Sequence, residues 1–272
     1  MRYVEAGWPI GLVHRGGGIL APENTLAAFA YSVALGYRYL ESDVRVTADG
    51  HIVLFHDATL DRVTDATGPV SERSLAELRQ LQVRGPAGWT GEPTPETAIC
   101  TLEEALDAFP DACFSVDLKD PRGIDPLIRI LRRPGVADRI CVAGAWDRAL
   151  AHVRAEAPGV ATALGWRALT GLMTCARLRL PAPRSLATGE FVHVPLALGA
   201  VGVWDDAVVG WAHGVGLRVV AWTVDTPEAV ARLLNAGVDA VITDRPDVVR
   251  EVLLARAAWR PMAGPEPRHA RA

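Results

Sequence analysis

The sequence predicts a closed (β/α)8 barrel, the architecture also called a TIM barrel, and three observations support this prediction. Short apolar runs alternate with longer segments that have the apolar spacing of helices. Strands that alternate with helices of roughly ten residues form a parallel sheet, and about eight such units favour a closed barrel over an open sheet. A dinucleotide-binding domain would carry GxGxxG after its first strand, whereas this chain reads HRGGG there.

Each element is assigned from its apolar pattern and from the residues at its ends. Asn24 or Thr25 can cap a helix that Gly36 ends, and Thr226 with Pro227 begins another. The predicted strands are residues 10–14, 38–44, 51–56, 112–118, 139–143, 160–164, 190–195, 217–223 and 239–243. The predicted helices are residues 24–35, 74–82, 101–108, 124–132, 146–155, 204–214, 226–235 and 246–257.

The chain is interpreted as one domain, residues 1–257, because neither a Pro/Gly/Ser-rich linker nor a block of charge divides it. Residues 57–100 interrupt the alternation with turn-forming residues and one short helix. They predict a small insertion within the barrel, after its second strand region. Residues 258–272 contain proline and arginine without periodicity, and we expect them to form a disordered tail.

Composition restricts the partners that the chain can have. A formal net charge of −4 provides no attraction for nucleic acid. No apolar run reaches membrane-spanning length, so no stable membrane insertion is expected. No apolar signal segment precedes the domain, and the four cysteines have no CxxC spacing, which favours a cytoplasmic protein with reduced thiols. The sequence leaves the oligomeric state open.

Two histidines and a pair of carboxylates lie within the first sixty residues. Glu41 and Asp43 alternate along a predicted strand, so their side chains share one face. Carboxylates held together inside a protein repel each other, and a divalent cation removes this conflict. Oxygen ligands favour magnesium, calcium or manganese over zinc. His14 and His56 each end an apolar run and could serve as acid and base near neutral pH, which together predicts metal-assisted cleavage of a phosphate ester.

A second alternating pair, Asp117 and Lys119, closes the strand predicted at 112–118. The apolar residues of this strand face the helices, so both charged side chains point toward the barrel centre. A buried carboxylate and a buried ammonium group need partners. Asp117 could be a third metal ligand with Lys119 on the phosphate, or the two could form a plain ion pair. The other motifs favour the first interpretation. Glu41 and Asp43 could likewise pair with arginines, but their inward parity argues against it.

Several short motifs follow one another between Val13 and Asp247. They are HRGGG, APENTLAAF, ESDV, LFHDATLDRVTDATG, SVDLK, AWTVD and GVDAVITDRPD. In this order the chain resembles the glycerophosphodiester phosphodiesterase family over nearly its whole length. The resemblance implies a TIM barrel that hydrolyses glycerophosphodiesters to glycerol 3-phosphate and an alcohol. It also implies a divalent cation as cofactor, Mg²⁺ or Ca²⁺ with Mn²⁺ as a further candidate, and a small-molecule glycerophosphodiester as partner.

The resemblance also implies roles for individual residues. The catalytic pair would be His14 and His56. Attack by water and attack by the glycerol 2-hydroxyl through a cyclic phosphate are both compatible with this pair. Arg15 and Lys119 would bind the phosphate, and Glu41, Asp43 and Asp117 would bind the metal. Trp222 would form a wall for glycerol or a plug of the barrel, and Glu23 would have a supporting role. The family usually has Glu where this chain has Asp117, which leaves the identity of the metal open.

Two alternative functions were weighed against this one. A relative that cleaves lysophospholipids or sphingolipids would need an apolar rim at the barrel mouth, and the insertion contains Trp89 but few other large apolar residues. A barrel that binds a phosphate ligand without turnover would be favoured by loss of a motif histidine, and both are present. Asp57 is assigned to a turn, Asp244 to the end of the last strand, and His193 to the core as a histidine with satisfied hydrogen bonds.

Overall fold

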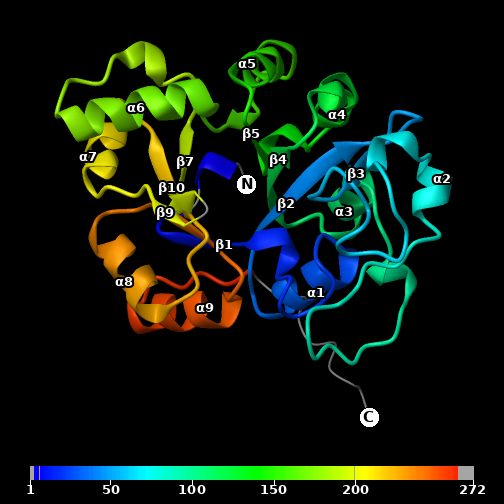
Figure 1. Cartoon of the computed structure of the whole chain (residues 1–272). Helices are drawn as coiled ribbons and strands as arrows, with labels where there is room; N and C mark the ends of the chain where they lie inside the picture. Colours follow the sequence, from blue (N-terminus) through cyan, green and yellow to red (C-terminus); the bar gives the residue numbers. More distant parts are fainter. Residues whose placement is uncertain (1–2, 6, 199, 263–272) are drawn as a thin grey trace.

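The computed structural model describes residues 3–5, 7–198 and 200–262, and within them eight parallel strands form a nearly closed barrel surrounded by helices (Figure 1). The predicted (β/α)8 architecture is confirmed. The strands, in chain order, are β1 (Ile10–Val13), β2 (Tyr39–Val46), β4 (Cys113–Leu118), β5 (Ile140–Gly144), β6 (Ala161–Thr162), β7 (Phe191–Pro195), β10 (Arg218–Trp222) and β11 (Ala240–Thr243).

Two contacts complete the ring of strands, one between β1 and β11 and one between β6 and β7. β1 pairs in parallel with β11, which sets Val13 beside Thr243. Between β6 and β7 the ring is completed by a single bridge, Ala163 to Phe191, in which the Leu164 amide donates to the Phe191 carbonyl at 2.9 Å. Because all eight strands run the same way, their carboxyl ends meet at one end of the barrel, where the site of such a fold lies.

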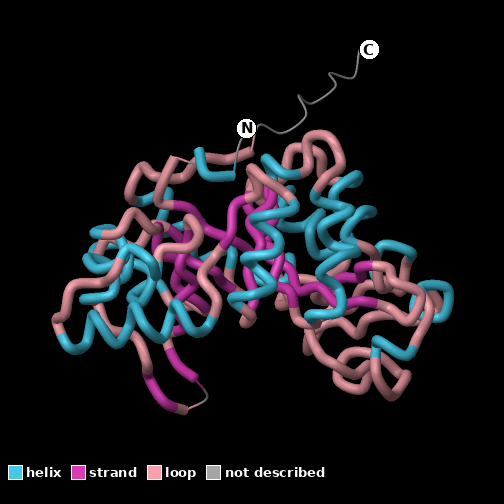
Figure 2. Tube along the Cα trace, turned by 90° about the horizontal axis from the view of Figure 1, so that it is seen from above, coloured by secondary structure: helices cyan, strands magenta, loops and turns pink. Residues whose placement is uncertain are grey.

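The helices cover the outside of the barrel (Figure 2). Thr25 caps the first by accepting the Ala28 amide, and Thr226 caps the eighth in the same way. The helices that follow barrel strands are α1 (Leu26–Ala34), α4 (Ile124–Leu131), α5 (Asp147–Glu156), α6 (Trp166–Leu178), α7 (Ala207–Gly214), α8 (Pro227–Asn235) and α9 (Pro246–Ala255).

Helix α6 is the element that sequence reasoning missed. Its N-cap is Gly165, which has no side chain to accept a backbone amide, so the usual start signal is absent. Two threonines and a glycine in its interior further weaken its helix propensity. Leu169, Leu172 and Ala176 are nevertheless buried along one face, and this packing stabilises the helix.

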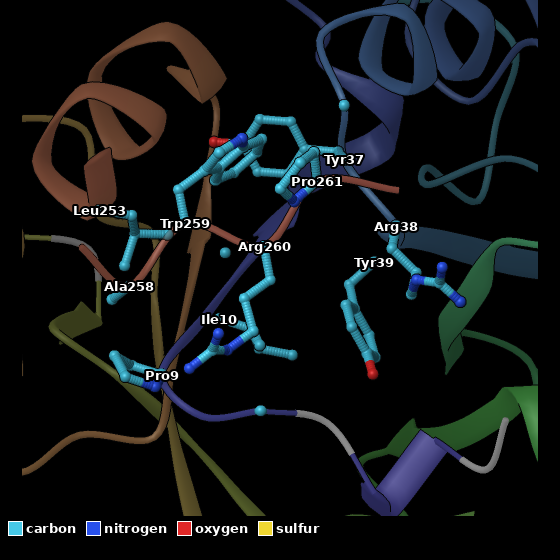
Figure 3. A pocket seen from close by; sticks show the side chains of 13 residues that line it. Pro9, Ile10, Tyr37, Arg38, Tyr39, Leu253, Ala258, Trp259, Arg260 and Pro261 are labelled. Atoms are coloured by element: carbon cyan, nitrogen blue, oxygen red, sulfur yellow. The ribbon is translucent and has the colours of Figure 1, made fainter. Parts of the chain in front are cut away.

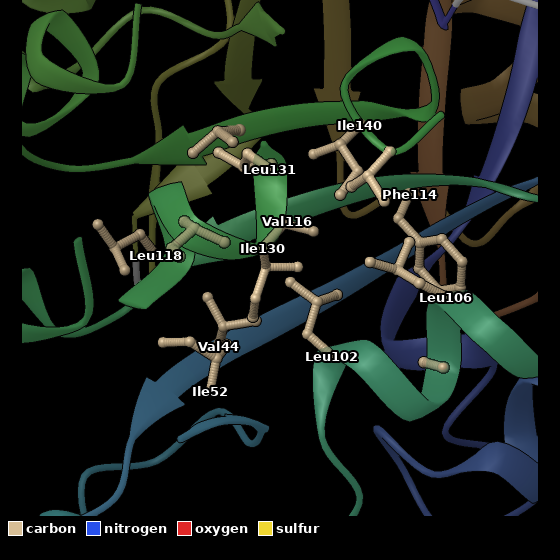
Figure 4. Packing of buried hydrophobic residues seen from close by; sticks show 14 of the residues in the cluster. Val44, Ile52, Leu102, Leu106, Phe114, Val116, Leu118, Ile130, Leu131 and Ile140 are labelled. Atoms are coloured by element: carbon tan, nitrogen blue, oxygen red, sulfur yellow. The ribbon is translucent and has the colours of Figure 1, made fainter. Parts of the chain in front are cut away.

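The core lies between the strands and the helices. On β4, Phe114 and Val116 point toward α4 and toward α3 (Leu102–Ala108), as their predicted outward parity requires (Figure 4). Each fully buried side chain of this size contributes roughly 1.5–3 kcal/mol to folding. The amino-terminal end of the barrel is filled differently, by Tyr3, whose ring meets Tyr39 and Phe191 edge to face with centroids 5.4 Å apart in each pair.

The segment predicted as an insertion, residues 57–100, follows an extra strand. β3 (Ile52–Leu54) pairs antiparallel with β2, so the predicted strand 51–56 lies beside the barrel rather than in it. The chain then forms α2 (Leu75–Leu78) and several turns. Leu60, Val70 and Leu78 of this segment form a small buried apolar cluster together with Val53 and Phe55. The insertion therefore has a packed interior and does not depend on the barrel core alone.

The first residues of the predicted tail lie against the amino-terminal end of the barrel. The Trp259 ring contacts Tyr37 edge to face at 4.8 Å, and the Met262 amide donates to the Gly36 carbonyl at 2.8 Å. Arg260 extends toward Pro9 over a cavity of about 160 Å³ (Figure 3). The rest of that tail, residues 263–272, lies outside the described residues. No helix among the described residues is long and apolar enough to cross a membrane.

Candidate active site

One pocket of about 210 Å³ collects the predicted site residues at the carboxyl end of the barrel. Every predicted site residue except Glu23 lines it. The side chains come from strands that are far apart in sequence but adjacent in the ring. The charged and aromatic residues of the lining are His14, Arg15, Glu41, Asp43, His56, Asp117, Lys119, His193 and Trp222.

The three carboxylates lie on the neighbouring strands β2 and β4. Asp43 and Asp117 are direct register partners, and Glu41 lies two residues earlier on the same face of β2 as Asp43. Glu41 and Asp43 are 6% and 1% exposed. Burial raises the pKa of Glu41 to about 7, and the adjacent Asp43 carboxylate adds to this shift. Burial likewise raises the pKa of Asp117 against the opposing effect of Lys119.

Two basic side chains, those of Lys119 and Arg15, neutralise part of the negative charge of these carboxylates. The Lys119 ammonium lies 2.6 Å from Asp117 Oδ2 and 3.1 Å from Asp43 Oδ1. The Arg15 guanidinium Nε lies 3.2 Å from Asp43 Oδ2. Although burial alone would raise it, the pKa of Asp43 is therefore held below its usual value. The Asp117–Lys119 ion pair and the phosphate-binding interpretation are compatible, because an anionic substrate can share these cations.

Glu23 lies behind Arg15 and joins it to the insertion. Its carboxylate accepts from Arg15 Nη1 at 2.9 Å and from Arg62 Nη2 at 2.6 Å. Arg62 also donates to Asp57. This geometry favours a supporting role for Glu23 in which its carboxylate orients Arg15.

The two histidines each have an aspartate partner. His14 Nδ1 lies 2.8 Å from Asp244 Oδ1, and His56 Nδ1 lies 2.5 Å from Asp57 Oδ1. Asp244 lies at the end of the last strand, as predicted, but its pairing with His14 was not predicted, and the assignment of Asp57 to a turn without contact with His56 was wrong. Adjacent side chains diverge only inside a regular strand, and residues 56 and 57 lie beyond the end of β3. Asp244 directly follows the last barrel strand, a position at which a closed barrel places functional residues.

These environments shift the pKa values of the two imidazoles in opposite directions. Burial alone would lower the pKa of His14, but the hydrogen bond with Asp244 and the nearby Glu41 carboxylate outweigh it and raise the pKa. For His56, burial lowers the pKa, and Arg15 and Lys119 reinforce this effect against the opposing carboxylates. The two pKa values are therefore moved apart, which suits one proton donor and one proton acceptor.

The backbone at the first motif is held in an uncommon conformation. Arg15 has φ 51° and ψ 29°, in the left-handed region, and its amide donates to Glu41 Oε2 at 3.0 Å. Gly16 follows with φ 76°, and a Cβ there would come within 2.6 Å of the Phe29 ring. The glycine is therefore required by its positive φ and by the Phe29 ring that packs against it.

His193 on β7 faces this pocket, so its assignment as a satisfied core histidine was wrong. Its Nε2 is buried and has no hydrogen-bond partner among the described residues. Burial lowers its pKa to about 4, so the ring is neutral at physiological pH. Trp222, at the end of β10, lies at the same part of the pocket. Neither the role of a glycerol wall nor that of a barrel plug is excluded by its position.

The carboxylates of Glu41, Asp43 and Asp117 are chemically suited to bind a divalent cation, although their side chains do not point toward a common position. No group of three or more His, Cys, Asp or Glu residues in the described part of the chain is placed to hold a metal ion. Asp43 and Asp117 are directed toward Lys119 instead. Burial, together with the adjacent Asp43 carboxylate, raises the pKa of Glu41, and a bound cation would favour its ionised form. Three carboxylates on adjacent strands are hard oxygen donors of the kind that Mg²⁺ and Ca²⁺ prefer.

Comparison with known proteins gives consistent results. Residues 14–248 match the sequence model of the glycerophosphoryl diester phosphodiesterase family. A protein of Mycobacterium tuberculosis named probable glycerophosphodiester phosphodiesterase 2 is 33% identical over 263 residues, which cover 95% of this chain and 96% of that protein. A glycerophosphodiester phosphodiesterase of Caldanaerobacter subterraneus is 30% identical over 246 residues, covering 88% and 95%.

Solved structures share the fold. The glycerophosphoryl diester phosphodiesterase domain of a second M. tuberculosis protein superposes with a TM-score of 0.73 at 24% identity, covering 91% of this chain and 99% of that one. An Oleispira antarctica phosphodiesterase, solved in complex with the product sn-glycerol 3-phosphate, has a TM-score of 0.71 at 24% identity and covers 90% and 97%.

Proposed function

Because the chain belongs to the glycerophosphoryl diester phosphodiesterase family and is an enzyme that hydrolyses glycerophosphodiesters, we propose that its reaction depends on a divalent cation and releases glycerol 3-phosphate and an alcohol. The observation that supports this most is the pocket itself. A single cavity at the carboxyl end of the barrel is lined by two histidines that have aspartate partners, two basic side chains and three carboxylates.

The residues that would hold the cation are Glu41, Asp43 and Asp117. Their oxygen donors suit Mg²⁺ or Ca²⁺, with Mn²⁺ as a further candidate. When bound, such a cation polarises a phosphoryl oxygen and offsets charge that develops in the transition state. It would also favour the ionised form of Glu41, whose pKa is raised by burial and by the adjacent Asp43 carboxylate.

Arg15 and Lys119 would bind the remaining phosphate oxygens. Both line the pocket, and both are held from behind by carboxylates, Arg15 by Glu23 and Lys119 by Asp117. Charge-assisted hydrogen bonds of this kind are short and directional. The ion pairs therefore orient the side chains of Arg15 and Lys119 before the substrate binds.

His14 and His56 would move the protons. Asp244 and Asp57 engage the Nδ1 atoms, which leaves each Nε2 for the reactants. One imidazole takes the proton of the nucleophile as its oxygen forms a bond to phosphorus. The other gives a proton to the alkoxide as the phosphorus–oxygen bond to the alcohol breaks. The nucleophile is water, or first the glycerol 2-hydroxyl and then water.

Trp222 would form the wall against which the glycerol moiety lies. The Oleispira structure contains sn-glycerol 3-phosphate in the same fold, and we extend this product to the present chain. The indole is half-buried at the end of β10 and borders the cavity that contains the cations. A flat apolar surface beside the phosphate site suits the carbon face of glycerol.

We further propose that residues 1–257 form a single catalytic domain, with 57–100 as an insertion. The Glu23–Arg62 ion pair, at 2.6 Å, joins the insertion to the catalytic residues. Cytoplasmic location remains part of this proposal, because all four cysteines are free thiols and three of them are buried. Nucleic acid is not among the proposed partners.

The test is hydrolysis by the purified protein of a panel of glycerophosphodiesters, with glycerol 3-phosphate measured as the product. We expect turnover with Mg²⁺, Ca²⁺ or Mn²⁺, loss after exhaustive chelation, and recovery on adding one of these ions back. Full activity in metal-free protein would contradict the proposed cation dependence. An absence of phosphodiester cleavage under every metal condition would contradict the proposed function.

A further inference from the structure

Arg62, a residue of the insertion, contacts two carboxylates that belong to different parts of the catalytic site. Its Nη1 and Nη2 atoms donate to Glu23 Oε2 and Oε1 at 2.9 and 2.6 Å. Its Nε donates to Asp57 Oδ2 at 2.5 Å. The planar guanidinium thus uses all three of its nitrogens, two for one carboxylate and one for the other. Arg62 itself does not line the catalytic pocket.

The two carboxylates lead to the two kinds of residue that the proposed reaction requires. Glu23 Oε1 also accepts from Arg15 Nη1 at 2.9 Å. Asp57 Oδ1 lies 2.5 Å from His56 Nδ1. A continuous chain of hydrogen-bonded side chains therefore runs from Arg15, the proposed phosphate ligand, to His56, one of the proposed proton-transferring residues. Arg62 is the central member of this chain.

Arg62 also determines how strongly the charge of Glu23 acts on Arg15. The Glu23 carboxylate is shared between the two arginines. Although burial alone would raise it, the pKa of Glu23 is held below its usual value by the hydrogen bond from Arg62 and by the charges of both arginines. Without Arg62, the full charge of Glu23 would act on Arg15 and reduce the attraction of its guanidinium for phosphate.

The same guanidinium fixes the carboxylate that orients His56. Burial opposes the shift, but the hydrogen bonds from Arg62 and His56 lower the pKa of Asp57 to about 2, so this carboxylate is ionised at physiological pH. Asp57 lies beyond the end of β3, so strand pairing does not fix its side chain. Arg62 therefore supplies the contact that keeps Asp57 turned toward the imidazole.

The insertion holds the backbone of Arg62 in place. Leu60 and Val63, on either side of Arg62, are 0% and 8% exposed and belong to the buried cluster of the insertion. The Thr64 amide and hydroxyl both donate to the Leu60 carbonyl, at 3.1 and 2.9 Å, and close a turn that contains Arg62. The Arg62 side chain is 46% exposed, and exposed ion pairs contribute little to stability. Its effect is therefore expected on the reaction rather than on the melting temperature.

We propose that Arg62 is a positioning residue for cleavage of the phosphodiester. Through Glu23 it orients Arg15 and preserves the attraction of that guanidinium for phosphate. Through Asp57 it orients His56 for proton transfer. The insertion thereby takes part in catalysis, although none of residues 57–100 lines the pocket. This inference rests on the proposed function and adds a residue to it.

The test measures kcat and KM of the full chain for glycerophosphocholine with a divalent cation present. Arg62→Ala should raise KM roughly tenfold, because Arg15 attracts phosphate less strongly, and should lower kcat roughly tenfold, because His56 is less well oriented.

The matched control is Arg79→Ala. Arg79 also lies in the insertion, is 49% exposed, and has its Nη2 2.6 Å from Glu104 Oε1, away from the catalytic residues. This variant should leave both constants at the wild-type values. The melting temperatures of both variants should stay close to that of wild type.

Two comparisons of double variants separate positioning from a structural role. If Arg62 acts on Arg15 through Glu23, Arg62→Ala should no longer raise KM in a Glu23→Ala background. If it acts on His56 through Asp57, Arg62→Ala should no longer lower kcat in an Asp57→Ala background. Loss of a merely structural residue would change both constants by the same factor in every background.

The outcomes distinguish this inference from the proposed function. Absence of cleavage by wild type contradicts the proposed function, and the role of Arg62 falls with it. Cleavage by wild type with unchanged kcat and KM in Arg62→Ala overturns the role of Arg62 alone. Equal losses in Arg62→Ala and Arg79→Ala overturn it too, as does an undiminished effect of Arg62→Ala on KM without Glu23 or on kcat without Asp57.

Discussion

His14 and Asp244 are separated by 230 positions in the sequence, yet His14 Nδ1 lies 2.8 Å from Asp244 Oδ1. The contact follows from the pairing of β1 with β11, which sets Val13 beside Thr243 and so brings the next residue of each strand together. A carboxylate on Nδ1 selects which nitrogen faces the pocket and favours the protonated ring. Asp244 thus acts on the reaction through His14.

Asp244→Asn should lower kcat by a part of the roughly 10²–10⁴-fold that a proton-transferring histidine contributes. The hydrogen bond with Asp244 raises the pKa of His14, so the limb of the pH–rate profile that belongs to His14 should move to lower pH. The control is Asp125→Asn, which breaks an exposed pair with His152. A lower rate without any displacement of the profile would indicate a merely structural role.

His14→Ala and His56→Ala should each lower turnover by roughly 10²–10⁴-fold, because each would remove one proton transfer from the transition state. KM should change much less, since Arg15 and Lys119 remain to bind phosphate. An aryl phosphodiester, whose leaving group needs no proton, should rescue only the variant that lacks the general acid. His152→Ala provides an exposed control. Near-normal turnover of an alkyl substrate in either variant would exclude that residue from proton transfer.

Glu41→Gln should fold normally and lose affinity for the divalent cation. In metal-free protein the folded pKa of Glu41, about 7, is above its unfolded value, so its ionised form opposes folding and does so fully above pH 7. Removing the charge should therefore leave the melting temperature equal or higher there. Calorimetric titration with Mg²⁺ measures the affinity. A variant that does not fold even at high cation concentration would identify Glu41 as a structural residue.

Asp117→Glu should retain more activity than Asp117→Ala. Glu is the residue usual in the family, and it can still pair with Lys119, which now lies 2.6 Å from the Asp117 carboxylate. Ala removes both a proposed cation ligand and that partner. The comparison requires kcat/KM for both variants across Mg²⁺, Mn²⁺ and Ca²⁺. Equal damage by Glu and Ala would mean that the cation site is built around the shorter side chain.

His193→Gln should make the protein less sensitive to mild acid. Burial lowers the folded pKa of His193 to about 4, below its value in the unfolded chain. The unfolded state therefore binds the extra proton first, and stability is lost as pH falls from the unfolded pKa toward about 4. The loss is on the order of a few kcal/mol at most. The melting temperature of wild type should fall relative to that of the variant as pH decreases from about 6.5 toward about 4. If the melting temperatures of wild type and variant change with pH in parallel, His193 does not cause the loss of stability in mild acid.

The fold was predictable because alternation and helix caps are local signals. The Thr25 and Thr226 caps and the outward parity of Phe114 and Val116 can be seen within a few residues of sequence, and each is confirmed. Helix α6 was missed because Gly165 provides no cap and its stabilisation comes from tertiary packing. Strand β3 was correctly found as a strand, but its antiparallel pairing with β2 has no local signature.

The motifs selected residues that line one pocket, but they did not indicate the partners of the two histidines. Asp57 and Asp244 required knowledge of how the chain turns after β3 and of which strands become neighbours when the ring closes. Three-dimensional contact between distant segments is the information that no local pattern contains.

Closure of the ring between β1 and β11 also has a consequence during synthesis. A ribosome releases the first histidine motif long before residue 244, so a nascent chain has an open barrel edge and a His14 without its carboxylate. Contacts over such sequence separations form late in folding. Hydrolytic activity should therefore be absent from every translation intermediate that stops before β11, and only the completed polypeptide should be able to consume its substrate in the cell.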